Sequence, residues 1–126
     1  MDEEITRLFA VTRDLPLWEG VDLSDINASN CDGDNALHLA VGYGDLSVTR
    51  ALIDAGIDIN KAGDLGYTPL HVASSRGKLD MVKLLIENGA DMFALNDGYP
   101  PFALARLMGH DHICDFLAPL MKQADP

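Results

Sequence analysis

The chain has 126 residues, of which 48% are hydrophobic, and a formal net charge of −11 at pH 7. This length suggests one domain, and the hydrophobic content is enough for a folded core and argues against disorder. The negative charge disfavours nucleic acid and anionic membranes as ligands, because binding to phosphate needs clustered Lys and Arg.

Residues 2–14 predict the first helix. Its apolar stripe has the i, i+3, i+4, i+7 spacing of one helix face and consists of Ile5, Leu8, Phe9 and Thr12. Leu15-Pro16 ends this helix, since the residue before a proline avoids the helical conformation. Residues 17–24 read as a short helical turn or a loop, and we favour the turn. The chain starts with acidic residues, whereas a secretory signal starts with basic ones, so we expect a cytoplasmic protein. It has no apolar run of about 18 residues, so we expect no transmembrane helix.

Residues 33–62 and 63–95 predict two helix pairs that repeat each other at an offset of 33 residues. The segment GDNALHLA (residues 33–40) returns as GYTPLHVA (residues 66–73), and two later glycines, Gly44 and Gly56, return as Gly77 and Gly89. Segments that recur at such a period indicate a stacked array of similar units. The chain is therefore expected to be all-α and built from helix–turn–helix units.

The second unit has the clearest helix boundaries. Thr68 and Pro69 suit the cap and first position of a helix over residues 69–76, and Gly77 suits its left-handed end. A second helix is predicted over residues 79–88, with Gly89 at its end. In the first unit Asn35 and Ala36 replace Thr68 and Pro69, so that helix lacks a proline start.

The ends of the chain are expected to close the stack. Residues 1–32 form an irregular N-terminal unit, and residues 96–120 form a degenerate C-terminal unit at an offset of 32 residues. Degenerate terminal units are expected because one of their faces meets water. Pro119 is expected to interrupt or restart the last helix, leaving residues 121–126 as a polar tail. Residues 1–126 thus make a single domain.

The GYTPLHVA segment, with Gly77, Leu84-Leu85 and Gly89-Ala90-Asp91, resembles an ankyrin repeat. This resemblance implies a solenoid of helix–turn–helix units joined by β-hairpin-like finger loops. It also implies a module that binds other proteins. His38 and His71 occupy the family position whose imidazole ties one repeat to the backbone of its neighbour, which favours a structural role over catalysis or metal binding.

The remaining candidates for chemistry are weak. His110, His112 and Cys114 are metal-ligand types, but on a helix only His110 and Cys114 would share a face, whereas zinc needs three or four ligands. Cys31 and Cys114 are expected to lie too far apart to form a disulfide. No nucleophile–base arrangement or phosphate-binding loop is present, so we expect no enzyme activity, no cofactor and no metal. An enzyme remains the alternative class, and a pocket lined by perturbed titratable groups would favour it.

The ankyrin resemblance places partner-binding positions at the finger tips and along the inner helices. The candidate site residues are Asp32, Asp34, Tyr43, Asp64, Leu65, Tyr67, Arg76, Asp97, Tyr99 and Met108. Neighbouring positions in the same regions are Cys31, Gly42, Ser75, Asn96 and Leu107. Tyrosine is enriched at protein interfaces, and aspartates at successive tips would form a negative ridge, although Asp-Gly is also good turn chemistry.

These features predict a protein that binds a basic partner protein through its finger tips and concave face. They leave its oligomeric state open, and we favour a monomer. One hypothesis is an inhibitor or antitoxin-like protein that neutralises its basic partner. The other is a general adaptor or scaffold with no inhibitory role.

Overall fold

The computed structural model describes residues 3–12 and 25–124. It confirms the first predicted helix as α1 (Glu3–Thr12), with Ile5 and Leu8 buried as the apolar stripe requires. The predicted end of this helix at Leu15-Pro16 and the turn or loop predicted at residues 17–24 lie outside the described residues. Within the described ranges, no helix has the length and apolar character needed to cross a bilayer.

Three helix pairs follow α1. The first pair is α2 (Ala36–Tyr43) and α3 (Leu46–Asp54), the second is α4 (Pro69–Ser75) and α5 (Leu79–Glu87), and the third is α6 (Pro101–Leu107) and α7 (Asp111–Ala124). A short 3-10 turn, η2 (Asp64–Gly66), lies between the first two pairs. The described part of the chain contains isolated β-bridges but no extended strand, which confirms the all-α prediction.

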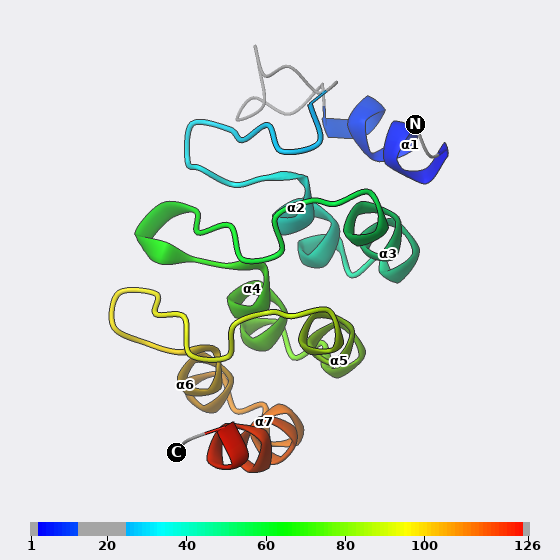
Figure 1. Cartoon of the computed structure of the whole chain (residues 1–126). Helices are drawn as coiled ribbons and strands as arrows, with labels where there is room; N and C mark the ends of the chain where they lie inside the picture. The colour runs from blue at the N-terminus through cyan, green and yellow to red at the C-terminus, as the bar shows by residue number, and fades with distance from the viewer. Residues whose placement is uncertain (1–2, 13–24, 125–126) are drawn as a thin grey trace.

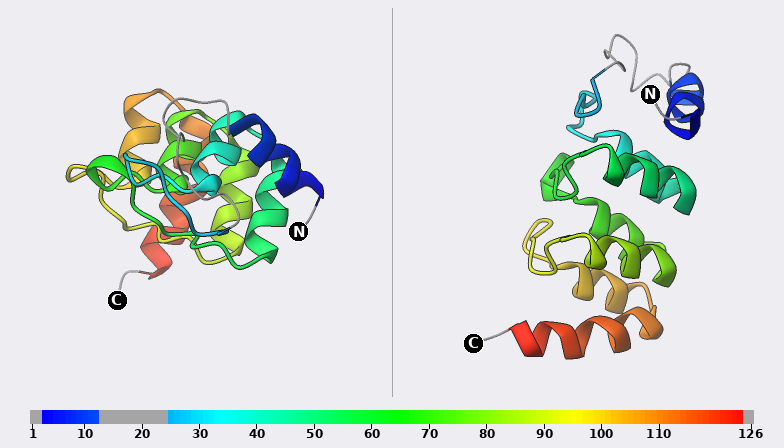
Figure 2. Two further views of the ribbon diagram at one scale, coloured as in Figure 1. Left: turned by 90° about the horizontal axis from the view of Figure 1, so that it is seen from above. Right: turned by 45° about the vertical axis from the view of Figure 1, so that its right-hand side comes forward.

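The pairs stack in two columns, and the loops that join them project to one side (Figure 1). In the inner column α4 packs between α2 and α6, and each inner helix also packs on the outer helix of its own pair. α1 packs on α3 and so extends the outer column (Figure 2). We call the projecting loops the first finger (residues 25–34), the second finger (58–67) and the third finger (91–99). Single bridges, such as that between Asn96 and Tyr99, give the first and third fingers their hairpin-like form.

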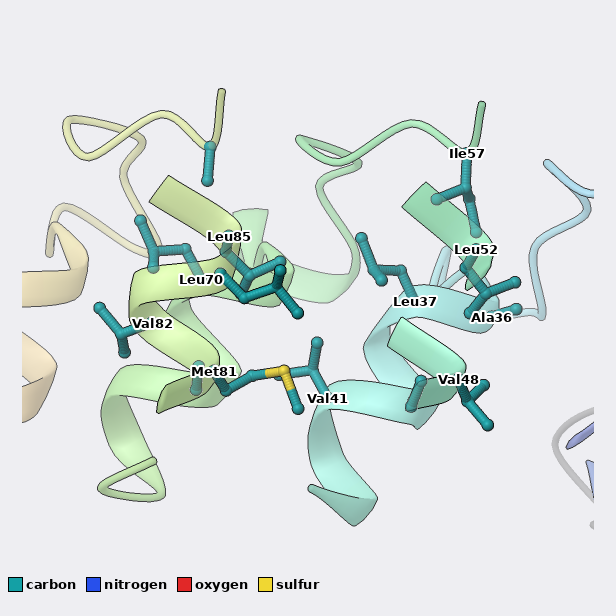
Figure 3. Packing of buried hydrophobic residues seen from close by; sticks show 14 of the residues in the cluster. Ala36, Leu37, Val41, Val48, Leu52, Ile57, Leu70, Met81, Val82 and Leu85 are labelled. Atoms are coloured by element: carbon teal, nitrogen blue, oxygen red, sulfur yellow. The ribbon is translucent and has the colours of Figure 1, made fainter. Parts of the chain in front are cut away.

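The core runs through the whole stack as one cluster. Leu37 and Leu70 of the inner helices face Leu52 and Leu85 of the outer helices, and all four side chains are fully buried (Figure 3). Met81 of α5 reaches across towards α2 and so links two pairs (Figure 3). Because each unit covers its apolar face with the next unit, the core can form only in the stack.

Side chains cap the N-termini of two inner helices, α2 and α4. The hydroxyl of Thr68 accepts a hydrogen bond from the backbone N–H of His71, as its position predicted. Asn35 caps α2 in the same way, since its side-chain oxygen accepts hydrogen bonds from the N–H groups of Leu37 and His38. The Asn35 amide also donates to the carbonyl of Asp58 in the second finger, 3.0 Å away. Asn35, which stands where the second unit has Thr68, therefore keeps the helix cap and adds a hydrogen bond between two units.

The prediction that Pro119 interrupts the last helix was wrong. α7 continues through Pro119 to Ala124, so residues 121–124 belong to the helix rather than to a tail. Pro119 is exposed, which lets water satisfy the carbonyl that loses its helical donor. Leu117 is fully buried, and Leu120 and Met121 are half-buried one turn later. This continued packing holds the helix together beyond the proline.

Adjacent serines at the end of α4 have opposite surroundings and give a matched test. The Ser74 hydroxyl is fully buried and has no hydrogen-bond partner among the described residues, whereas the Ser75 hydroxyl bonds to Tyr67 and to the carbonyl of Val72. An unpaired buried hydroxyl is costly, so Ser74→Ala should raise the free energy of unfolding by about 1 kcal/mol. Ser75→Ala should lower it by about 0.5–1 kcal/mol. Urea denaturation of both variants measures the two changes, and a Ser74→Ala variant less stable than the parent would contradict this account.

Candidate functional site

Two buried histidines fix the fingers onto the inner helices. The Nε2–H group of His38 donates to the carbonyl of Tyr67 at 2.7 Å, and that of His71 donates to the carbonyl of Tyr99 at 2.9 Å. On the other side of each ring, Nδ1 accepts from a backbone N–H, that of Asn35 for His38 and that of Thr68 for His71. Each imidazole therefore joins the start of its own helix to the next finger, which agrees with the predicted structural role.

Burial lowers the pKa of both His38 and His71 below the ordinary value, despite the opposing backbone hydrogen bonds. Both rings are thus neutral at pH 7. Protonation at Nδ1 would also set a new N–H against the backbone donor that this nitrogen accepts from. The folded state consequently resists protonation at these two sites.

This resistance predicts that acid destabilises the fold through the two histidines. In the unfolded chain a histidine titrates near pH 6.5, so below that pH the unfolded state takes up protons that the folded state does not. The stability contributed by each ring is complete above about pH 6.5 and is lost as the pH falls towards the lowered pKa of the folded state. Urea denaturation at about pH 7.5 and about pH 5.5 should show this loss, and a His38→Gln/His71→Gln variant should show a smaller difference between the two conditions. Equal losses of stability in the parent and in the double variant would contradict this account.

Asparagines form a second set of ties between fingers. The side-chain oxygen of Asn27 accepts from the backbone N–H of Asp58 at 3.0 Å, and that of Asn60 accepts from the N–H of Asp91 at 2.7 Å. The second and third fingers also meet directly, since the N–H of Asp97 donates to the carbonyl of Leu65 at 3.0 Å. The three fingers are therefore held in one register along the stack.

A groove lies between the finger bases and the inner helices, with a volume of about 550 Å³. Five of the ten predicted site residues line it, namely Asp34, Tyr43, Tyr67, Arg76 and Met108. They come from all three units, because Asp34 and Tyr67 stand at finger bases whereas Tyr43, Arg76 and Met108 stand at the ends of α2, α4 and α6. The structure thus brings together side chains that are far apart in sequence.

Contacts with its neighbours fix the side chain of Tyr67 in the groove. Its hydroxyl lies 2.6 Å from the Ser75 hydroxyl, and its ring centroid lies 5.6 Å from that of His71. Tyr43 is 57% exposed and Asp34 is half-buried, with its carboxylate 3.8 Å from Nε2 of His38. The groove therefore offers one fixed aromatic ring, one exposed aromatic ring and a carboxylate.

The other five predicted residues lie outside the groove lining. Asp32, Asp97 and Tyr99 are exposed on the first and third fingers, and nothing is described of the Asp64 side chain. Leu65 is 68% exposed and holds a left-handed backbone conformation with φ of +58°. By chain position Leu65 corresponds to Asp32 and Asp97, so an apolar residue stands between the two acidic tips.

Sequence reasoning missed several residues of this surface. Leu39 and Val72 line the groove one helical turn before Tyr43 and Arg76, and the i, i+4 spacing could have found them. Phe93 and Leu95 are exposed on the third finger, at positions that correspond to Asn60 and Ala62 on the second. Nothing local in the sequence marks these two as surface residues, because large apolar side chains are usually buried.

The suspected metal ligands have structural partners. His110 and His112 direct Nε2 to the carbonyls of Ser75 and Gly77, at 3.0 and 3.2 Å, and so pin the start of α7 to the turn after α4. No cluster able to hold a metal ion occurs among the described residues. Cys31 and Cys114 are free, as predicted, and burial raises the pKa of the Cys114 thiol.

Comparison with known proteins identifies the repeated unit. A family model for ankyrin repeats (3 copies) matches residues 10–96 and 62–126. A search of curated proteins gave no match.

Proposed function

Because the chain belongs to the ankyrin-repeat family, whose repeats generally mediate contacts between proteins, we propose that it binds a basic partner protein along the groove and the finger tips. The observation that carries this proposal is the groove, in which Asp34, Tyr43, Tyr67, Arg76 and Met108 meet. It combines exposed aromatic and apolar area with a few polar groups, the composition that protein interfaces favour.

The charge of the protein supports a basic partner. The net charge of −11 creates a negative field, and Asp32 and Asp97 place exposed carboxylates at the tips beside the groove. Complementary charge speeds the encounter of two proteins and disfavours acidic competitors. Association should accordingly be faster at low ionic strength.

Binding rather than catalysis is the proposed activity, and the cytoplasm is the proposed location. The partner could be neutralised, as by an antitoxin-like inhibitor, or simply held, as by a scaffold. Strong acidity suits the first role, since it matches the surface of a basic nucleic-acid-binding partner. Measuring the activity of the partner with and without this protein separates the two roles.

Charge reversal at two finger tips tests the proposal. The Asp32→Lys/Asp97→Lys variant should keep its fold, because both side chains are exposed and such substitutions usually change stability by about 0.5 kcal/mol or less. It should bind a partner captured from the native lysate by the parent protein at least about tenfold more weakly, as measured by calorimetry.

The matched control is Asp54→Lys/Glu87→Lys, which makes the same change of charge on the exposed surface of the outer helices. Retained binding by this control locates the interface at the fingers. Equal losses in both variants would mean that only net charge matters, and full binding by the tip variant would place the interface elsewhere.

A further inference from the structure

The groove changes character from unit to unit along the stack. One row of equivalent positions follows the ends of the inner helices and consists of Tyr43, Arg76 and Met108. A second row follows the finger bases and consists of Asp34 and Tyr67, which line the groove, and Tyr99, which lies beyond the lining. Because the units stack in order, each row is also a line in space, with neighbouring helices about 8–10 Å apart.

Along these rows, the first unit is acidic. Asp34 lies in the groove, and the exposed Asp32 stands on the same finger. Lys61 and Asp58 lie close enough to affect His38 electrostatically, but their charges offset each other. The first unit therefore favours a cation.

The second unit carries the opposite charge. Arg76 is exposed in the groove and makes no ion pair with any acidic side chain that the structure describes. A basic partner residue placed here would face an unneutralised guanidinium, and like charges brought together at an interface cost several kcal/mol. A positive charge at this place disfavours a second basic residue and favours an acidic one.

In the third unit the end of α6 and the finger base are apolar, and the carboxylate of Asp97 stands at the finger tip. Met108 is 59% exposed and Leu107 is 70% exposed at the end of α6, and Tyr99 is exposed at the finger base of the same unit. The corresponding positions in the second unit are Arg76, Ser75 and Tyr67. The hydroxyls of Ser75 and Tyr67 form a hydrogen bond with each other. Large exposed apolar side chains that adjoin a groove indicate a contact surface for another protein.

We propose that the groove reads a partner segment in a fixed order, with a basic residue over Asp34, an acidic residue over Arg76 and a bulky apolar residue over Met108, Leu107 and Tyr99. This inference rests on the proposed function and specifies the chemistry of its partner. Arg76 and Met108 are equivalent positions on stacked helices, so the acidic and the apolar group of the segment lie about 8–10 Å apart. The acidic residue in the middle distinguishes the segment from a merely basic one.

Selection from a random peptide library displayed on phage tests the order and does not require the natural partner. The full chain should enrich peptides that contain a basic, an acidic and a bulky apolar residue in sequence, in either chain direction. A parallel selection on the Arg76→Glu variant should enrich peptides that carry a basic residue, instead of an acidic one, at the middle of the three positions. Met108→Glu should weaken the peptides selected on the parent by about tenfold, whereas Ala118→Glu, the same change of charge at an exposed position of α7, should leave their affinity unchanged.

The outcomes separate this inference from the proposed function. Enriched peptides that bind in the groove but are indifferent to Arg76→Glu would overturn the order and leave the proposed function standing. A selection that enriches nothing, or only peptides insensitive to changes at Tyr43, Asp34 and Met108, would overturn both. Circular dichroism of each variant confirms that a loss of binding is not a loss of fold.

Discussion

Gly66→Ala should lower the free energy of unfolding by about 3 kcal/mol, the largest loss expected from a single methyl group in this protein. Gly66 has φ of +85°, a conformation that costs alanine about 1–2 kcal/mol. A Cβ atom on Gly66 would also lie 2.5 Å from the backbone carbonyl oxygen of Leu95. Because this neighbour is backbone, the third finger would have to move away from the second. Urea denaturation measures the loss.

Gly98→Ala is the matched control for Gly66→Ala. Gly98 is the equivalent position on the third finger and has nearly the same backbone conformation, with φ of +88°. Apart from its chain neighbours, no described atom lies within 4 Å of its Cβ position. The control should therefore show only the conformational cost of about 1–2 kcal/mol. If both variants lost the same stability, the close approach of the two fingers would contribute nothing.

His71→Ala should cost about 2–3 kcal/mol of stability and leave partner binding by the folded fraction intact. The side chain is fully buried, so its loss removes packing as well as the hydrogen bonds to Thr68 and to the Tyr99 carbonyl. The Tyr99 carbonyl would lose its tie to the second unit, and the third finger would lose an anchor. Denaturation measured alongside calorimetric binding distinguishes loss of stability from loss of activity.

His112→Ala is the comparison for this second variant. His112 also directs Nε2 to a backbone carbonyl, that of Gly77, but it is exposed, and water can replace its bond. The change in stability should stay within about 0.5 kcal/mol. A His71→Ala variant of full stability that had lost binding would show that His71 acts in recognition and not in the framework.

The features that local chemistry determines were predictable from sequence. The cap at Thr68 and the helix end at Gly77 depend on neighbours within a few residues, whereas the ties of His38 and His71 were implied by the ankyrin resemblance. The structure agrees with all of them. The run of α7 past Pro119 was missed because the burial of Leu117 and the packing of Met121 against the core outweigh one lost hydrogen bond. Propensity cannot weigh tertiary packing of this kind.

The candidate site was predictable only in part. Half of the proposed residues line the groove, because the repeat period correctly placed the ends of the inner helices side by side. The row of acidic tips is interrupted at Leu65, whose left-handed backbone holds an exposed apolar side chain where the neighbouring fingers carry a carboxylate. A non-glycine residue in that conformation is held there by its surroundings, in this case by the hydrogen bond from Asp97 to its carbonyl.

The ties between fingers make the protein modular in its evolution. The first finger is joined to the second by the same asparagine bond that joins the second to the third, and His38 and His71 repeat a second bond at the same interval. A duplicated unit inserted between existing units would thus find matching donors on one side and matching acceptors on the other. Gene duplication could lengthen the recognition surface by whole units without redesigning the junctions. A change of length within a unit must instead be absorbed by its finger, as in the third finger, which is one residue shorter than the second and still receives the bond from His71. Growth by whole units requires no such adjustment.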